Sequence, residues 1–131
     1  MNHENWSRYP LENLTKVILV AYRDRYRLEE AKSLVGSLQN EIVKVYTQKY
    51  LDRAEFGMGS GKAEEIKNSV KEHSVDEIQQ LIVDEHLTTK QIHNLEKLTE
   101  LQVIDRERLI LNIFLRELLQ PNQSSRFNSQ K

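Results

Sequence analysis

The sequence predicts a three-layer α/β domain, built on an open sheet of four parallel strands in the order 2-1-3-4 with helices on both faces. Four apolar runs of strand length alternate with four segments of helical periodicity. The connections between them are short, and strands joined through a helix pair in parallel with right-handed crossovers. The first and third runs have the most apolar character, which places them at the centre of the sheet, and the run between them is typical of an edge strand.

The first half of the chain supplies two strands and the helix between them. Residues 16–22 are continuously apolar, as in a strand that is buried on both faces. The apolar residues that follow have helical spacing: Leu28, Ala31, Leu34, Val35 and Leu38. Residues 42–50 alternate, which predicts an edge strand with one wet face. Val43, Val45 and Thr47 lie on one side of it, and Lys44, Tyr46 and Gln48 lie on the other.

The second half supplies three helices and two strands. Ala63, Ile66 and Val70 mark a helix, and residues 78–84 form the third apolar run. Thr88 and Gln91 form the pattern of a capping box ahead of the next helix. After the short fourth run, residues 101–104, Asp105 can cap a last helix that extends to about Leu119.

These elements place the domain at residues 15–119. Residues 1–14 form an N-terminal extension with enough apolar side chains to pack loosely on the domain. Residues 120–131 are mostly Asn, Gln, Ser and Lys, which predicts a disordered tail.

Composition narrows the classes of function. Charged residues make up 30% of the 131 residues and nearly balance, for a net charge of −1, so the overall charge is not that of a nucleic-acid binder. The absence of cysteine excludes disulfides and thiolate metal sites. No apolar run approaches the ~20 residues that span a bilayer. We therefore expect a soluble, cytoplasmic protein with no membrane partner.

The most informative segment is residues 56–62, which leads directly into a helical pattern. It contains three alternating glycines, Gly57, Gly59 and Gly61. Glycine lets the backbone approach a ligand closely, and a helix start offers unpaired N–H groups that suit phosphate. The segment thus predicts a phosphate- or RNA-binding loop in which Ser60 caps the helix and Lys62 supplies charge. The alternative is a mobile linker.

This loop departs from the Walker P-loop at two positions. Phe56 stands where that motif has its first glycine, and Ala63 stands where it has the hydroxyl that binds Mg²⁺. The usual route to nucleotide hydrolysis is therefore not expected here.

Polar residues follow the two central strands, where ligands of open parallel sheets bind. Arg23 follows the first strand, and Asp84, Glu85 and His86 follow the third. We expect Arg23 and Asp84 to contribute to the nucleotide site. Asp84 and His86 could also perform acid–base chemistry or bind a metal, although such residues are ordinary in turns and caps.

The last helix is apolar around its whole circumference, which indicates contact on two sides. The residues that we expect at an interface are Leu111, Phe114, Leu115 and Leu118. The occupant could be another copy of the chain, a partner protein, or residues 6–14 folded back.

Several segments, in order and spacing, resemble the N-terminal domain of the HflX family of ribosome-associated GTPases. The resemblance covers about residues 16–115. It is carried by Leu28-Glu29-Glu30-Ala31, Gly59-Ser60-Gly61-Lys62, Asp84-Glu85, Asn94-Leu95-Glu96, Val103-Ile104-Asp105-Arg106 and Leu109-Ile110-Leu111. His86 and Thr89 depart from it, because the family usually has glutamate and proline there.

The resemblance implies an α/β domain that binds a nucleotide or ribosomal RNA, with the glycine-rich loop as a contact. It implies no hydrolysis, because this sequence contains neither the helical hairpin nor the GTPase domain that follow in the family. The leading hypothesis is a non-catalytic, stand-alone binding domain whose ligand is a purine nucleotide, GTP or ATP, or large-subunit RNA. The alternative is an interaction scaffold, such as a homodimer, that acts through the last helix.

Overall fold

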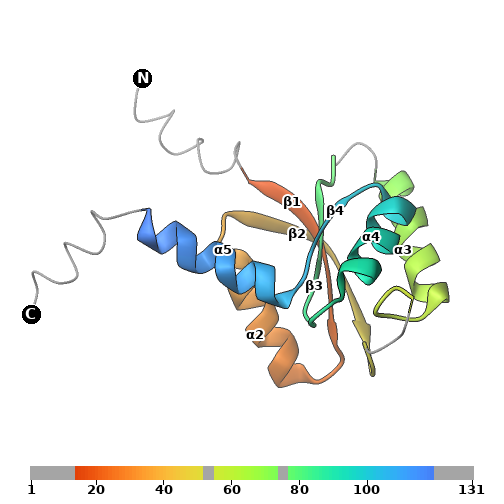
Figure 1. Ribbon diagram of the computed structural model, residues 1–131, viewed down its shortest axis with the longest axis horizontal. Coiled ribbons are helices and arrows are strands. Elements are labelled where there is room, and N and C mark those ends of the chain that lie inside the picture. Colours follow the sequence, from red (N-terminus) through yellow and green to blue (C-terminus); the bar gives the residue numbers. More distant parts are fainter. Residues whose placement is uncertain (1–13, 52–54, 74–76, 120–131) are drawn as a thin grey trace, which may run out of the picture.

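The computed structural model describes residues 14–51, 55–73 and 77–119, which form one α/β unit (Figure 1). The predicted fold class and strand order are confirmed, because the four parallel strands lie in the order β2-β1-β3-β4. The elements are β1 (Thr15–Tyr22), α2 (Arg25–Gly36), β2 (Asn40–Gln48), α3 (Ser60–Glu72), β3 (Gln80–Val83), α4 (Thr89–Thr99), β4 (Gln102–Ile104) and α5 (Arg106–Leu118).

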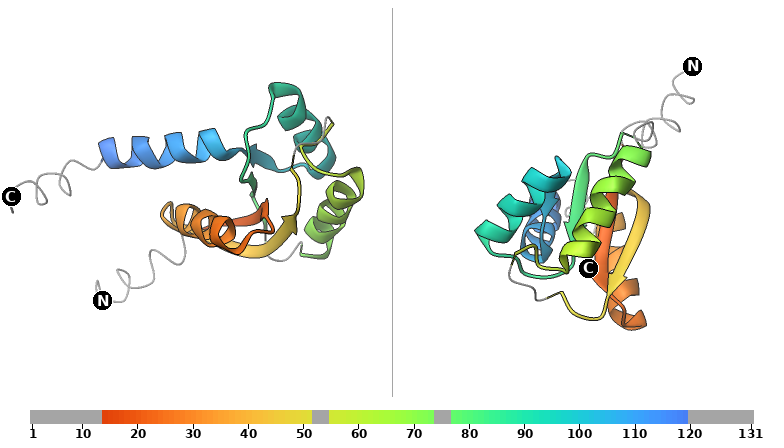
Figure 2. Two further views of the ribbon diagram at one scale, coloured as in Figure 1. Left: turned by 90° about the horizontal axis from the view of Figure 1, so that it is seen from below. Right: turned by 90° about the vertical axis from the view of Figure 1, so that its right-hand side faces the viewer.

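Helices cover the sheet on both faces and separate two apolar cores. Helices α3 and α4 lie on one face and α2 and α5 on the other (Figures 1 and 2). Successive residues of β1 point to opposite faces, so Ile18 and Val20 pack toward α3 and α4 whereas Val17 and Leu19 pack toward α2 and α5. This double burial explains why the first strand is continuously apolar.

The edge strand β2 departs from the simple alternation in its sequence. Val17 pairs with Ile42, but the next residue, Ile18, pairs with Lys44, so Val43 is an extra residue at a register shift. A bulge of this kind reverses which side chains face each layer. The expectation of one wet face is wrong at Tyr46, because helices cover both faces of the sheet and Tyr46 is buried against α3 and α4.

The predicted helix starts at Thr88 and Asp105 are confirmed. Thr88 and Gln91 form the reciprocal capping box of α4. The Asp105 carboxylate accepts a hydrogen bond from the Arg108 amide and caps α5. The predicted extension, apart from Leu14, and the predicted tail lie outside the described residues. Among the described helices, none is long and apolar enough to cross a membrane.

Parallel strands bring their carboxyl ends to one edge of the sheet, which we call the carboxyl edge. The segments that follow β1, β3 and β4 start there, and α2, α4 and α5 begin close to it (Figure 1). The functional residues suggested by the sequence belong to segments that leave this edge or enter α3. The residues on the outer face of α5 are the exception.

Candidate functional site

Gly57 holds the glycine-rich loop against the domain. Its backbone has φ +73°, which favours glycine, and a Cβ atom there would overlap the side chain of Leu87. Leu87 belongs to the β3–α4 connection, so the two loops pack directly on each other. Met58, the next residue, is fully buried in the core. Gly57 is therefore required by packing, and close approach to a ligand is not needed to explain it.

Gly59 and Gly61 have no such packing role. Nothing lies within 4 Å of a Cβ atom built at either position. Gly59 is the N-cap of α3 and provides no side-chain cap, so the expectation that Ser60 caps this helix is wrong. The first hydrogen bond of α3 runs from the Ala63 amide to the Gly59 carbonyl. The amides of residues 60–62 thus precede the hydrogen-bond ladder of the helix.

Lys62 lies on the first turn of α3, with its side chain directed along the helix toward β2. Its ammonium group is 3.2 Å from the Glu65 carboxylate and 5.3 Å from the centre of the Tyr46 ring. The charge is therefore close to the helix start, but it already has partners. An anion at the amides would have to compete with Glu65 for Lys62.

Asp84 forms a buried ion pair instead of an open ligand site. Its side chain is fully buried, and its Oδ1 atom accepts a 2.8 Å hydrogen bond from the Arg106 guanidinium. Arg106 also lies 3.7 Å from Glu30. The other carboxylate oxygen of Asp84, Oδ2, has no hydrogen-bond partner in the described part of the chain. Burial raises the pKa of Asp84, and the nearby Arg106 charge opposes that rise.

Tyr22 and Glu85 join β1 to the end of β3 at the same edge. The Tyr22 hydroxyl donates to the Glu85 carboxylate, and the Arg27 guanidinium lies 3.8 Å from the centre of the Tyr22 ring. Burial, followed by the hydrogen bond to Glu85, raises the pKa of Tyr22 to about 12. The phenol therefore stays protonated at neutral pH and acts as a hydrogen-bond donor.

The sequence-predicted site residues do not form one cluster. Arg23 is exposed, and Asp84 contacts Arg106 rather than His86 or the glycine-rich loop. His86 instead faces Asp105 and Glu107, so an acid–base pair between Asp84 and His86 is not formed. The predicted neighbourhood of β3 and β4 could have revealed Arg106, because Arg106 comes two residues after β4 and Asp84 comes directly after the neighbouring strand β3.

The outer face of α5 carries the predicted interface residues. Leu109 is buried against the sheet and Ile113 packs beside it. Around the other side of the helix, large apolar side chains remain exposed by 43% to 79%. They are Ile110, Leu111, Phe114, Leu115, Leu118 and Leu119. We call these six residues the α5 patch.

Comparison with known proteins places this arrangement in a family. Residues 25–115 match the family described as GTP-binding GTPase N-terminal. The chain is 36% identical over 105 residues to GTPase HflX of Caldanaerobacter subterraneus, covering 76% of this chain and 24% of that protein. It is 35% identical over 102 residues to GTPase HflX of Escherichia coli, covering 77% and 23% respectively.

A solved structure shows the same fold. The crystal structure of SsGBP in complex with GDP superposes with a TM-score of 0.63 at 25% identity, covering 78% of this chain and 29% of that one. The chain thus spans about a quarter of the length of the HflX proteins that it matches. The described domain belongs to the GTP-binding GTPase N-terminal family, and it corresponds to the N-terminal domain of the HflX proteins.

Proposed function

We propose that this protein is a non-catalytic binding domain that holds a phosphate group of a nucleotide or of ribosomal RNA. The contacts are the main-chain amides at the start of α3, between Gly59 and Lys62. A helix start combines unpaired N–H groups with the positive end of the helix dipole, which suits an anion. Lys62 adds a positive side chain on the first turn.

The observation that carries this proposal is the open space around Gly59 and Gly61. Gly61 lies inside the first turn of α3, where alanine would be more stable by about 1 kcal/mol. Nothing in the described structure would obstruct a side chain there. Gly61 therefore weakens the helix start without a packing reason, and neither glycine has a side chain that would cover the neighbouring amides. Access for a ligand explains that combination.

A hollow at the start of the loop is the place where we propose that the rest of a ligand lies. It has a volume of about 370 Å³ and lies between Phe56 and α4, although none of residues 57–62 lines it. Phe56, Asn94 and Lys97 line it. Asn94 donates a 2.9 Å hydrogen bond to the Glu55 carbonyl and so ties α4 to the loop. An aromatic ring and a lysine suit a base or an RNA backbone.

The proposal omits hydrolysis because the sequence departs from the Walker pattern at Phe56 and Ala63. Ala63, which stands at the position of the Mg²⁺-binding hydroxyl, is buried in the core of α3 and the sheet. The matched relatives are GTPases and one solved relative holds GDP. GTP and GDP are therefore the first nucleotides to examine, followed by ATP and large-subunit RNA.

We expect Gly59→Val to weaken nucleotide or RNA binding at least ten-fold, because a branched side chain would screen the amides that follow it. Lys62→Ala should weaken binding by a smaller factor, since Lys62 already pairs with Glu65. Equilibrium titration of labelled GTP, ATP and ribosomal large subunits against each variant measures both effects.

Gly36→Val is the matched control, because Gly36 also has nothing within 4 Å and ends the distant helix α2. It should bind like the wild type. The loop has no such role if Gly59→Val, Lys62→Ala and Gly36→Val all bind every ligand as the wild type does.

An alternative function rests on the α5 patch. The α5 patch gathers six large exposed apolar side chains on α5 and its C-cap, and large exposed apolar patches mark sites of protein–protein contact. We propose as the alternative that the domain is an interaction scaffold that self-associates through this helix.

Phe114→Asp should convert such a dimer to a monomer at micromolar concentration, because a carboxylate would be buried without a partner at the centre of the contact. Sedimentation velocity measures the change. Tyr26→Asp is the control, since Tyr26 is 81% exposed on α2 and outside the patch. A wild type that is monomeric at these concentrations contradicts the alternative.

A further inference from the structure

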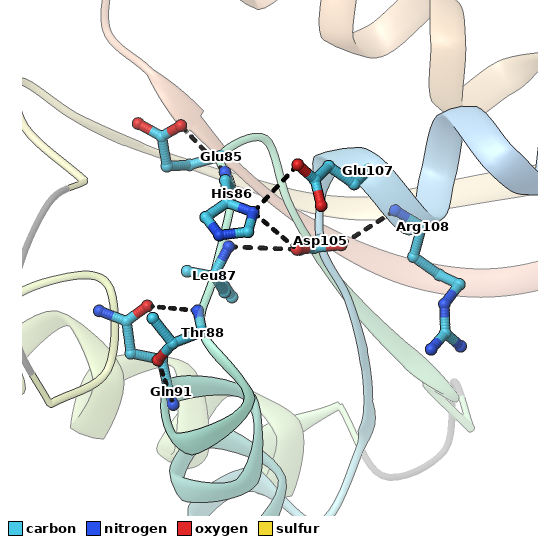
Figure 3. A network of polar contacts seen from close by, with 8 residues as sticks. All are labelled: Glu85, His86, Leu87, Thr88, Gln91, Asp105, Glu107 and Arg108. Atoms are coloured by element: carbon cyan, nitrogen blue, oxygen red, sulfur yellow. Dashed lines mark hydrogen bonds and ion pairs between the residues drawn. The ribbon is translucent and has the colours of Figure 1, made fainter.

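Three metal-ligating side chains converge at the start of α5, away from the glycine-rich loop. His86 comes from the β3–α4 connection, Asp105 is the N-cap of α5, and Glu107 lies in the first turn. The His86 Nδ1 atom is 3.2 Å from Glu107 Oε2 and 4.0 Å from Asp105 Oδ2 (Figure 3). One ligand atom from each of the three residues lies within 4.8 Å of the other two.

Hydrogen bonds of backbone amides fix the Asp105 carboxylate and the backbone of His86. The His86 amide donates to Glu85 Oε1 at 2.9 Å, and the Leu87 amide donates to Asp105 Oδ2 at 3.1 Å (Figure 3). The Arg106 amide donates to the Glu85 carbonyl at 3.2 Å. The segment after β3 and the segment after β4 are thus tied together before any ion binds. Pre-positioned ligands reduce the entropy lost on binding.

The spacing suits a metal ion better than a single proton. A protonated His86 Nδ1 can donate a hydrogen bond to Glu107 Oε2 at 3.2 Å, but Asp105 Oδ2 at 4.0 Å is beyond hydrogen-bond distance. An ion with ligands at about 2.1 Å places neighbouring ligand atoms roughly 3.0–3.4 Å apart. The distance from His86 to Asp105 must shorten, and the His86 side chain, which is 61% exposed, is free of the packing that would prevent this.

We propose that His86, Asp105 and Glu107 bind one divalent first-row transition ion, of which Zn²⁺ is the representative. An imidazole with two carboxylates suits such ions, whereas Mg²⁺ and Ca²⁺ prefer oxygen ligands alone. Each Asp105 oxygen accepts one backbone hydrogen bond and keeps another lone pair for the ion. Water completes the coordination, because His86 and Glu107 are exposed.

Two features set the expected affinity of this site for the ion. The positive end of the α5 dipole opposes a cation and weakens binding by roughly two- to five-fold. Three ligands with open positions also bind less tightly than a closed four-ligand zinc site. We therefore expect weaker binding than that of structural zinc. The site shares no residue with the proposed phosphate contact, and the two regions meet where Leu87, next to His86, packs near Gly57.

Calorimetric titration of the full chain with Zn²⁺ in a non-chelating buffer tests the proposal. We expect one saturable site, no comparable binding of Mg²⁺, and a loss of at least ten-fold in affinity for both His86→Ala and Glu107→Gln. Zn²⁺ should also raise the melting temperature of the wild type, because an ion that binds the folded state stabilises it by mass action.

His93→Ala is the matched control, because His93 is an exposed histidine on the neighbouring helix α4 and outside the cluster. It should bind Zn²⁺ like the wild type, whereas the two cluster variants, confirmed as folded by circular dichroism, should not. Equal Zn²⁺ affinity in the wild type and His86→Ala would overturn the proposal, as would the absence of a saturable site in the wild type.

Discussion

Arg106→Gln is expected to lower the free energy of unfolding by about 3 kcal/mol, because it leaves a fully buried carboxylate without its counter-charge. Asp84 makes its hydrogen bond to Arg106 through one oxygen, and the other has no partner in the described structure. Without the Arg106 guanidinium, Asp84 must take up a proton or remain ionised while buried, with the more weakly acting charge of Arg27 as the remaining cation. Urea denaturation followed by circular dichroism measures the loss.

Two variants separate the ion pair from a general effect of losing an arginine. Arg108→Gln removes an exposed arginine from the same turn of α5 and should change stability by less than about 0.5 kcal/mol. The double variant Asp84→Asn/Arg106→Gln should recover much of the loss, because no buried charge remains. An Arg106→Gln protein as stable as Arg108→Gln would show that the pair does not stabilise the carboxyl edge.

Gly57→Ala is expected to destabilise the protein by about 2–4 kcal/mol. Alanine at φ +73° is strained, and its Cβ atom would overlap Leu87 in the core. Because Leu87 follows His86 directly, the damage should extend to the β3–α4 connection. Thermal unfolding measures the effect, as a fall in melting temperature.

Gly61→Ala, in the same loop, is expected to have the opposite effect on stability. It should stabilise the protein by about 0.5–1 kcal/mol, because alanine favours a helix and finds open space there. Comparison of the two variants separates the packing role of Gly57 from the open position of Gly61. If both substitutions were neutral, the backbone and packing account of the loop would be wrong.

Most of the fold follows from periodicity in the sequence. The continuous apolar run of β1 predicts burial on both faces, and the short helical segments between the runs predict parallel pairing. The capping box at Thr88 and the cap at Asp105 also appear as local patterns. These features depend on neighbours in the chain, so one sequence is enough to reveal them.

Features that depend on distant contacts are harder to predict. The bulge at Val43 arises from pairing with β1, and it places Val45 on the same face as Ile42, while Tyr46 packs on the opposite face. The three glycines are alike in sequence, but only Gly57 has a positive φ and a neighbour in its Cβ position. That difference comes from Leu87, which is thirty positions further along the chain.

The candidate site shows the same limit. Asp84 stands at the carboxyl edge, where open sheets bind ligands, yet Arg106 and Glu30 occupy its surroundings. Tyr22 and Glu85 fill the neighbouring position through their own hydrogen bond. The residue types that follow the strands therefore predict where polar side chains gather. Which of these side chains pair with each other depends on the order of the strands in the sheet.

The most direct test of the phosphate-binding proposal is amide chemical-shift mapping by ¹⁵N NMR during titration with GTP. The proposal predicts saturable shifts that are largest at the amides of Ser60, Gly61 and Lys62, and that disappear in Gly59→Val. ATP and short ribosomal RNA fragments, titrated in the same way, identify which phosphate carrier is preferred. If all three ligands leave these amides unshifted at millimolar concentration, the start of α3 is not a phosphate site.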